Sequence, residues 1–560
     1  YAALTRFEHL ADDIVHAPDR GRWLDQFGQP GALQDLARIL GASDFLWEDF
    51  IRAQYENLLP LLQRRAGDGP VAFSAAALEA RLGEALARCA TDSARREALN
   101  AWKDREIFDI DLQHILSDDR DVRRLAEPLT RLAEIVVRTA VGFAEARLAA
   151  RHGTPRTVGG LPTSLAVCGL GKLGGVALGY ASDIELLFVY ADSGRTDGPG
   201  ALGNAEYFDR LVQETTAGVS AKREGVFQID LRLRPYGKAG PLACSLDSFC
   251  RYYGPGGAAL SYERLALVRL RAVAGDRDLG ARIERLRDQF IYESATISIP
   301  ELHELRGRQV AEKVGGGRPN AKFSPGALVD LEYCVQMLQV QHGGVHPALR
   351  TPRIHEAVQA LSQIGLLDRG ESQRLTQAYY FLRRLINGLR MLRGNALDLF
   401  LPEPDSLEYR HLARRMGYQP RQDLDVGLQL FADFETETAV VRRFVQRHFG
   451  RTAMAGTGQG NVVDLLLGEA PPAEQVSRIL GRMGLRDPQR ALTNLRLLAG
   501  PPDRGEDFLR LAVLAGDALH LTADPDMALN NWQRFVETLP DPARHFAELL
   551  LQPRRLEVLL

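Results

Sequence analysis

Hydrophobic periodicity changes along the chain, and this change limits the fold more than any other feature. From about residue 30 to 150, apolar residues recur three and four positions apart, as in amphipathic helices. Between about 160 and 275 the pattern becomes short β-rich runs separated by Gly-rich turns. From about 276 to 450 the helical period returns, and it is clearest over 375–392. The sequence therefore predicts an α+β chain in which an α/β domain is inserted among mainly α-helical domains.

These changes of pattern divide the chain into five expected segments. They are an N-terminal helical domain (1–160), the α/β domain (161–275), a helical domain that completes the same unit (276–450), a polar linker (451–462) and a last helical region (463–560). Within the α/β domain we expect strands at 164–168, 184–190 and 226–233 and a helix at 204–223. The last region is either a regulatory helical domain or the start of a second repeat.

The two ends of the chain share a loose pattern of apolar and aromatic residues. Residues 3–33 and 528–556 align after a small gap. Either they are unrelated helices built from common residues, or a second copy begins near the end of the chain. Since the first residue is Tyr1 rather than Met, the second alternative leads us to expect a fragment of a longer tandem protein.

Composition excludes several classes of protein. The 69 basic and 72 acidic residues leave a net charge of −3, so no overall basic field gathers nucleic acid or anionic lipid. The five cysteines form neither a disulfide framework nor a C-x-x-C pair. No stretch approaches the length of a membrane span, and the first residues given show no basic region followed by an apolar one. We therefore expect a cytoplasmic protein that binds neither nucleic acid nor a membrane.

The most informative stretch is the Gly-rich run at 169–175, which has three interpretations. It fits G-x-G-x-x-G, but a dinucleotide-binding turn has its acidic residue about 20 positions further on, and here the acids come too early. A P-loop requires Ser or Thr after the lysine, and Leu173 stands there. The third interpretation uses the early acids, together with a turn whose backbone N–H groups bind phosphate.

Two of these acids, Asp183 and Glu185, flank one apolar residue at the start of the second expected strand. Since side chains alternate along a strand, both carboxylates are expected on one face and Ile184 on the other. Such a pattern is also typical of a solvated strand edge. Two carboxylates side by side repel each other, however, and such a pair is usually maintained by bound cations.

The third expected strand adds an acid and two cations. Asp230, Arg232 and Arg234 are expected on one of its faces. The arginines either face solvent or neutralise a phosphate. An acid pair on one strand, a third acid on its neighbour and a Gly-rich turn upstream predict a two-metal site for phosphoryl or nucleotidyl transfer.

These motifs carry a family resemblance. Gly169-Leu-Gly-Lys-Leu-Gly-Gly175, Ser182-Asp-Ile-Glu185 and Asp230-Leu-Arg-Leu-Arg-Pro235 closely resemble the glutamine synthetase adenylyltransferase family, whose members carry polymerase-β-like nucleotidyltransferase domains. The resemblance runs from Leu40-Gly-Ala-Ser-Asp-Phe45 to about residue 420. Further matching motifs are Gly240-Pro-Leu242, Tyr262-Glu-Arg264, 266–269, Lys322-Phe-Ser-Pro-Gly326, Asp330-Leu-Glu332 and 381–384.

The resemblance implies a function in nitrogen metabolism. Family enzymes are tandem: the N-terminal half removes AMP from a tyrosine of glutamine synthetase by phosphorolysis, and the C-terminal half attaches AMP from ATP. The signalling protein PII regulates both reactions. Gly240-Pro-Leu242 is more similar to the deadenylylating half, so we expect this chain to release ADP from adenylylated glutamine synthetase. The alternatives are ATP-dependent adenylylation and a catalytically inactive regulatory module.

The resemblance also assigns candidate site residues. Asp183, Glu185 and Asp230 are expected to be catalytic and to hold two Mg²⁺ ions. The expected phosphate- and nucleotide-binding residues are Gly171, Lys172, Gly174, Gly175, Ser182, Arg232, Arg234, Lys322, Asp330 and Glu332. Two residues depart from the family pattern: Glu185 replaces an Asp, and Ala327 replaces a Gly. The second departure leaves two roles open for Lys322, Asp330 and Glu332, which either bind substrate phosphate or ribose or pin the helical domain to the α/β domain.

Overall fold

The computed structural model describes residues 2–16, 20–27, 32–42, 73–117, 121–221, 227–294, 297–315, 317–394, 398–450, 460–500 and 506–560. The chain forms two compact units. Unit 1 comprises Tyr1–Ile299, Gln336–Ala357 and Arg390–Asp398, and unit 2 comprises Pro300–Val335, Val358–Leu389 and Leu399–Leu560. The five segments expected from the sequence remain a prediction.

Among the described residues, the sheet of unit 1 has five strands. They are β2 (Leu165–Gly169), β3 (Ile184–Tyr190), β5 (Ile229–Asp230), β6 (Ala243–Ser245) and β7 (Arg271–Gly275). The order is β5-β3-β2-β7, with β6 also paired to β3. Strand β2 runs antiparallel to β3 and β7, whereas β3 runs parallel to β5 and β6. A separate antiparallel pair joins β1 (Pro155–Thr157) to β4 (Gly194–Thr196).

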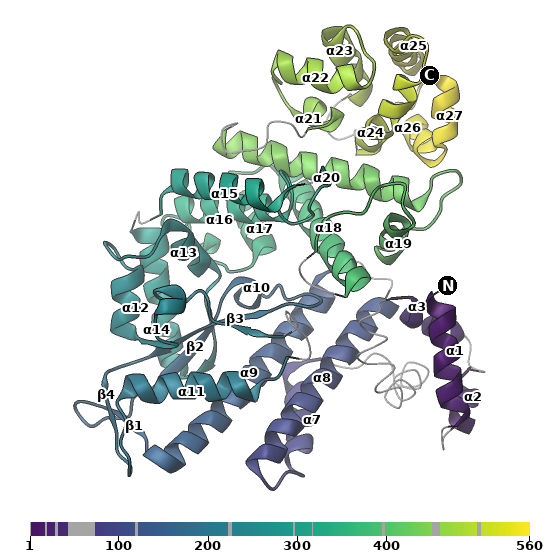
Figure 1. Cartoon of the computed structure of the whole chain (residues 1–560). Helices are drawn as coiled ribbons and strands as arrows, with labels where there is room; N and C mark the ends of the chain where they lie inside the picture. The colour runs from purple at the N-terminus through teal and green to yellow at the C-terminus, as the bar shows by residue number, and fades with distance from the viewer. Residues whose placement is uncertain are drawn as a thin grey trace. The chain divides into compact units, whose positions relative to one another are not determined.

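The central strands are apolar because both of their faces are covered. Every residue of β2 is buried, and β3 buries all of its residues except the half-buried Glu185. The two predicted strands at 164–168 and 184–190 are thereby confirmed within one residue. Strand β7 contacts α9 (Arg123–His152) and α14 (Arg277–Asp288), and β6 contacts α11 (Asn204–Gly218) and α12 (Leu246–Tyr253). Figure 1 labels these four helices together with β2 and β3 of the same sheet.

Long helices flank the sheet in unit 1. Helices α7 (Ala75–Leu86), α8 (Asp92–Leu116) and α9 contribute fully buried residues such as Leu99, Leu132 and Val136 to the same core as the strands. Helices α1 (Ala2–Val15) and α3 (Ala32–Ala42) share a second apolar cluster with α8, and α2 (Arg20–Phe27) contacts both. The helical prediction is therefore confirmed where the chain is described. Residues 43–45 of the first matching motif lie outside the described residues.

The prediction of a strand over 226–233 is wrong. Only Ile229 and Asp230 pair with β3, and the chain then turns. The carboxylate of Asp230 accepts a hydrogen bond from the backbone N–H of Arg232 (Oδ1···N 2.9 Å), which gives the backbone an alternative to the ladder. The three residues Asp230, Arg232 and Arg234 therefore do not share one strand face. The predicted helix at 204–223 ends at Gly218 as α11, and residues 222–226 lie outside the described part.

Unit 2 is built from helices. The helix predicted at 375–392 is confirmed within α18 (Arg369–Arg393), where Leu375, Leu382 and Leu385 are fully buried. The other helices in this part of the chain are α15 (Ile299–Lys313), α16 (Leu328–His342), α17 (Ile354–Gln363), α19 (Leu407–Arg415) and α20 (Val426–Phe449). The ends of α16 and α18 and the start of α17 belong to unit 1, which also holds α10 (Gly171–Gly174) and α13 (Ser261–Ala266).

The helices of the C-terminal region of unit 2 share one cluster of buried apolar residues. These helices are α21 (Val462–Leu467), α22 (Ala473–Arg482), α23 (Pro488–Ala499), α24 (Glu506–His520), α25 (Pro525–Glu537), α26 (Pro542–Leu551) and α27 (Pro553–Leu559). An Asp-Pro pair begins three of these helices: Asp487, Asp524 and Asp541 each cap a helix whose first residue is proline. Of the expected linker, residues 451–459 lie outside the described part.

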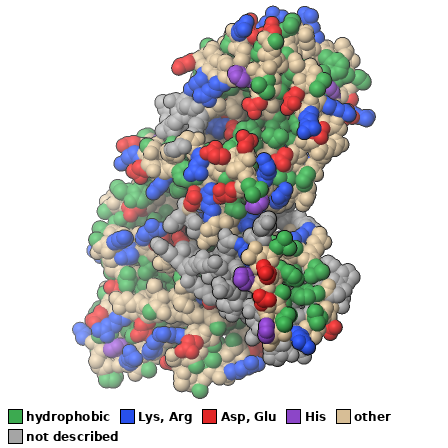
Figure 2. Space-filling model, turned by 45° about the vertical axis from the view of Figure 1, so that its right-hand side comes forward, with side chains coloured by type: hydrophobic (Ala, Val, Ile, Leu, Met, Phe, Trp, Pro, Cys, Tyr) green, Lys and Arg blue, Asp and Glu red, His purple; other side chains and the backbone are tan. Residues whose placement is uncertain are grey.

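Charged side chains of both signs are distributed over the described surface that Figure 2 shows. On the face shown in Figure 2, Lys and Arg side chains are interspersed with Asp and Glu among the described residues, so neither sign of charge dominates it. Within the described residues, no helix combines the length and apolar character that crossing a membrane requires.

Candidate active site

The parallel pairing of β3 with β5 brings the predicted acids together. Glu185 on β3 is the register partner of Asp230 on β5. Asp183 lies just before β3, two residues from Glu185, with the fully buried Ile184 between them. The ladder is supported by hydrogen bonds from the N–H of Ile184 to the carbonyl of Gln228 (2.8 Å) and from the N–H of Phe227 to the carbonyl of Ser182 (3.0 Å). The structure thus places three carboxylates at one end of the sheet.

Arg232 is the counter-ion of this acidic group. Its guanidinium contacts both carboxylate oxygens of Asp230, with Nε 2.8 Å and Nη2 2.6 Å from Oδ2. Burial raises the pKa of Asp230, but the hydrogen bonds and charge of Arg232 and the charge of Arg234 outweigh burial and lower it. The pKa of Arg232 is raised by its bond to Asp230, and the charges of Asp183 and Glu185 add to this effect. Arg232 therefore pairs with Asp230, and the charges of Asp183 and Glu185 act on it as well.

The donor set fits a divalent cation in part. Among the described residues, Asp183 Oδ1 is a buried oxygen that has no hydrogen-bond partner, and such an atom is costly unless a ligand satisfies it. Carboxylate oxygens are the ligands that Mg²⁺ prefers. Over the same described ranges, however, no three His, Cys, Asp or Glu residues are grouped closely enough to hold a metal ion. Asp183 and Glu185 fit a cation, whereas Asp230 is bonded to Arg232.

The Gly-rich run includes the short helix α10, and two of its glycines are required because a larger side chain would collide with neighbouring atoms. Gly171 has φ +50°, and a Cβ there would collide with Oε2 of Glu185, so only glycine leaves room for this carboxylate. A Cβ on Gly174 would collide with the carbonyl oxygen of Arg269. The N–H groups of Gly174 and Gly175 donate to the carbonyls of Leu170 and Gly171 (2.9 and 3.0 Å). Phosphate binding by Gly171, Lys172, Gly174 and Gly175 remains a prediction.

Two other candidates make hydrogen bonds within the loops of unit 1. Ser182 is buried, and its hydroxyl oxygen accepts the N–H of Gly179 (3.0 Å). Arg234 donates to the carbonyls of Leu231 (2.7 Å) and Gly240 (3.2 Å), which closes the turn after β5. Arg234 therefore stabilises the turn that follows Asp230, and a phosphate role for it and for Ser182 is untested.

The chain is similar to proteins of one family. Residues 33–286 match the family described as glutamate-ammonia ligase adenylyltransferase, a range that includes all three acids, and residues 301–450 match the family described as GlnD PII-uridylyltransferase. The chain belongs to the glutamine synthetase adenylyltransferase family. The resemblance seen in the sequence is thereby confirmed.

Three relatives carry the name bifunctional glutamine synthetase adenylyltransferase/adenylyl-removing enzyme. The relative from Thioalkalivibrio sulfidiphilus is 29% identical over 97% of this chain and 57% of its own length. The relative from Bordetella bronchiseptica is 33% identical over 78% of this chain and 45% of its own length. The relative from Stenotrophomonas maltophilia is 37% identical over 55% of this chain and 33% of its own length. The chain spans about half the length of the first two of these curated relatives.

The second acidic motif of this family member lies in unit 2 and is tied within that unit. Asp330 is buried, and its two oxygens accept hydrogen bonds from Arg306 Nε (2.7 Å) and from the N–H of Gly326 (2.6 Å). Glu332 lies 4.0 Å from Arg383, and the Lys322 ammonium stands 5.0 Å from the ring of Phe323. The described bonds of Asp330 hold the turn that begins α16. A substrate role for Lys322, Asp330 and Glu332 remains a prediction.

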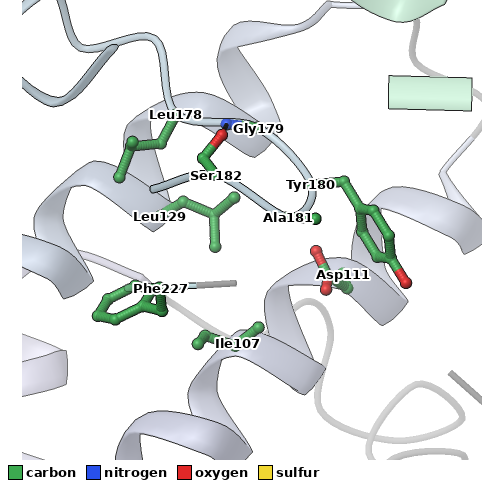
Figure 3. Close-up of a pocket in the computed structure, with 9 residues that line it drawn as sticks. All are labelled: Ile107, Asp111, Leu129, Leu178, Gly179, Tyr180, Ala181, Ser182 and Phe227. Atoms are coloured by element: carbon green, nitrogen blue, oxygen red, sulfur yellow. Dashed lines mark hydrogen bonds between the residues drawn. The ribbon is translucent and has the colours of Figure 1, made fainter. Parts of the chain in front are cut away.

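Sequence reasoning missed a buried acid beside the site. Asp111 on α8 is 2% exposed, and among the described residues its Oδ1 has no hydrogen-bond partner. It lines a pocket of about 370 Å³, open space at the mouth included, together with Leu129, Phe227 and residues 178–182. Figure 3 shows one carboxyl oxygen of Asp111 directed toward Ala181. The available signal was the position of Asp111 four residues after the buried Ile107, on the apolar side of the helix.

Replacing Gly174 with alanine should destabilise unit 1 even when no phosphate is bound. The new Cβ would collide with a backbone carbonyl, and such overpacking costs about 1–3 kcal/mol or more. Gly142→Ala is the matched control, because a Cβ at that helical position meets nothing within 4 Å and should stabilise α9 by about 0.5–1 kcal/mol. Urea unfolding followed by circular dichroism measures both. Equal stability of the Gly174 variant and the parent chain would contradict the packing role.

Replacing Asp111 with asparagine should stabilise the protein at neutral pH. Burial raises the pKa of Asp111 to about 8, from 3.8 in the unfolded chain. Since the folded state keeps its proton while the unfolded state loses it, stability falls as pH rises from about 4 to about 8. The variant should therefore exceed the parent by roughly 1–3 kcal/mol at pH 7.5 and should lose this advantage near pH 4.5.

Urea unfolding of both chains at pH 4.5, 6 and 7.5 tests this prediction. The control is Asp92→Asn, which changes an exposed acid on the same helix and should shift stability by about 0.5 kcal/mol or less at every pH. A difference between Asp111→Asn and the parent that stays constant with pH would refute the raised pKa.

Proposed function

We propose that this chain is a catalytic nucleotidyltransferase unit that removes AMP from adenylylated glutamine synthetase by Mg²⁺-dependent phosphorolysis. The observation that carries the proposal is the register of Glu185 with Asp230 on parallel strands, with the unpartnered Oδ1 of Asp183 beside them. The family supports the choice of protein substrate, since its named members are adenylyltransferase/adenylyl-removing enzymes.

The proposed reaction transfers the adenylyl group from tyrosine to inorganic phosphate. A phosphate oxygen forms a bond to the α-phosphorus, the bond from that phosphorus to the tyrosine oxygen breaks, and the tyrosinate takes up a proton. The products are ADP and unmodified glutamine synthetase. Asp183, Glu185 and Asp230 would hold Mg²⁺, which when bound neutralises charge on the phosphates and lowers the pKa of a bound nucleophile.

The residues of the chain have separate tasks in this proposal. Asp183 and Glu185 present carboxylate oxygens, and Gly171 leaves the space that Glu185 occupies. Arg232 is 70% exposed although it contacts Asp230, so its guanidinium can turn to an incoming phosphate and release the third carboxylate. Binding of substrate phosphate and completion of the acidic site would then be coupled through one side chain.

The direction of the reaction rests on the sequence. Gly240-Pro-Leu242 follows the acidic turn and resembles the deadenylylating half, and Gly240 is required because a Cβ there would collide with the carbonyl of Pro235. With ATP and unmodified glutamine synthetase the same carboxylates would support adenylylation. PII is the proposed regulator, in keeping with the match of residues 301–450 to the GlnD PII-uridylyltransferase family.

One observation favours a second candidate, a regulatory module without turnover. The third acid is neutralised by Arg232, and within the described ranges no three-residue metal group is formed. Such a module would bind nucleotide or phosphate and transmit the state of the site to another catalytic unit. Turnover separates the two candidates, since a module of this kind binds its ligand but releases no product.

Product formation in two parallel mixtures tests the function. The purified chain is incubated with Mg²⁺, inorganic phosphate and adenylylated glutamine synthetase, and separately with Mg²⁺, ATP and unmodified glutamine synthetase. We expect ADP release in the first mixture and no AMP transfer in the second. AMP transfer alone would reverse the direction, and silence in both mixtures with intact phosphate binding would favour the regulatory module.

Neutralising Asp183 or Asp230 should strongly reduce turnover. Asp183→Asn and Asp230→Asn each remove a carboxylate charge with little change in shape, and we expect a loss of at least about 100-fold in ADP release, equal to roughly 2.7 kcal/mol of transition-state stabilisation. Asp247→Asn, at an exposed helical position of unit 1, should keep the parent rate. Circular dichroism checks that the variants fold. Full activity of Asp230→Asn would contradict the assignment of the site.

A further inference from the structure

The segment that leads into Asp183 has an unfavourable backbone. Residues 176–183 connect α10 to β3, and within this connection Val176 and Ala181 have φ +51° and +50°. L-residues with a β-carbon rarely adopt these angles, and each one costs on the order of 1–3 kcal/mol. Contacts from elsewhere must therefore hold the segment, because its local preference is to relax.

Arg390 near the end of α18 supplies such contacts. Its side chain is 6% exposed, and Nη1 lies 3.0 Å from the carbonyl oxygen of Tyr180 and 3.5 Å from Oγ of Ser182. These acceptors stand on either side of Ala181, the strained residue. Arg390 and residues 178–182 belong to the same compact unit, although about 210 positions separate them.

Apolar packing places the same helix end against the segment. Met391, next to Arg390, is buried in one cluster with Tyr180 and Ala181. The segment therefore rests on α18 through both polar and apolar contacts. Burying a guanidinium costs desolvation free energy that an apolar side chain would not cost. We therefore expect Arg390 to do more than fill this space.

The contacts of Arg390 affect Asp183 through the backbone, because the held segment leads directly into this acid. Ser182 precedes Asp183 directly, and its hydroxyl also accepts the N–H of Gly179 (3.0 Å). If the bonds from Arg390 are lost, Ala181 is free to return to a negative φ, which rotates the peptide planes that follow it. Asp183 would then move relative to Glu185, whose place on β3 is held by the ladder.

We propose that Arg390 is a positioning residue that holds the 178–182 segment and thereby aims the carboxylate of Asp183 at the acidic site. This inference rests on the proposed function for the role of Asp183 as a cation ligand. Arg390 touches neither substrate nor cation in it, and acts only through the backbone and hydroxyl of the segment.

Direct binding of Mn²⁺ to the whole chain, measured by electron paramagnetic resonance, tests the inference without any turnover. Mn²⁺ is the probe because it prefers the same oxygen ligands as Mg²⁺. We expect Arg390→Met to weaken binding at least tenfold and Arg390→Lys, which retains a donor for the Tyr180 carbonyl, to restore part of the loss. Arg393→Met is the matched control, since Arg393 lies one turn further on α18 and pairs with Asp398 (2.9 Å).

Hydrogen–deuterium exchange of the peptide that covers 178–187 provides a readout independent of metal. We expect faster exchange in Arg390→Met, an intermediate rate in Arg390→Lys and the parent rate in Arg393→Met. Unchanged exchange and unchanged Mn²⁺ affinity in a folded Arg390→Met chain would overturn the inference. If Arg390→Met does not fold, Arg390→Gln, which keeps a polar group in the buried position, is judged by the same criteria.

The two readouts separate this inference from the proposed function. If the parent chain binds no Mn²⁺, the cation site of the proposed function fails, and exchange alone decides whether Arg390 holds the segment. If the parent chain binds Mn²⁺ and Arg390→Met binds it equally well, the cation site of the proposed function is retained and the positioning role of Arg390 is refuted.

Discussion

The pairing of β3 with β5 is the interaction on which the candidate site depends. It covers only two residue pairs, yet it sets Glu185 beside Asp230 and holds Asp183 through the adjoining hydrogen bond from Phe227 to Ser182. Carboxylates brought this close repel each other, and a positive partner is needed to offset the repulsion. Arg232 is that partner in the described structure, and the tight turn after Asp230 brings it there. The same turn that ends the strand therefore neutralises the site.

Costly features gather around these acids. A buried oxygen of Asp183 has no partner among the described residues, Ala181 and Val176 have positive φ, and the uncharged form of Asp111 is favoured by burial under the same segment. Each feature opposes folding on its own, and the apolar core of the sheet and of α8 and α9 must offset them. Local violations of this kind are expected where a structure serves function, because a site shaped for a ligand leaves groups unsatisfied without it.

The buried acid Asp330 of unit 2 differs from Asp183, because both of its carboxylate oxygens accept hydrogen bonds, one from Arg306 and one from Gly326. At the Asp-Pro starts of three C-terminal helices, the aspartate side chain likewise accepts one of the otherwise unpaired N–H groups of the first turn. These described contacts stabilise unit 2, and a substrate role for Asp330 remains a prediction.

Much of this protein could be determined from its sequence by itself. The bounds of β3, the long helix α18 and the family all follow from periodicity and from motifs of a few residues, because these depend on local backbone preference and side-chain alternation. The side-by-side placement of Asp183, Glu185 and Asp230 was also expected. Only the tertiary structure decided that Asp230 ends its strand and bonds to Arg232, that Asp111 is buried, and that Arg390 reaches Tyr180. The reason is physical: these contacts join residues whose local patterns are compatible with several surroundings, and packing selects one of them.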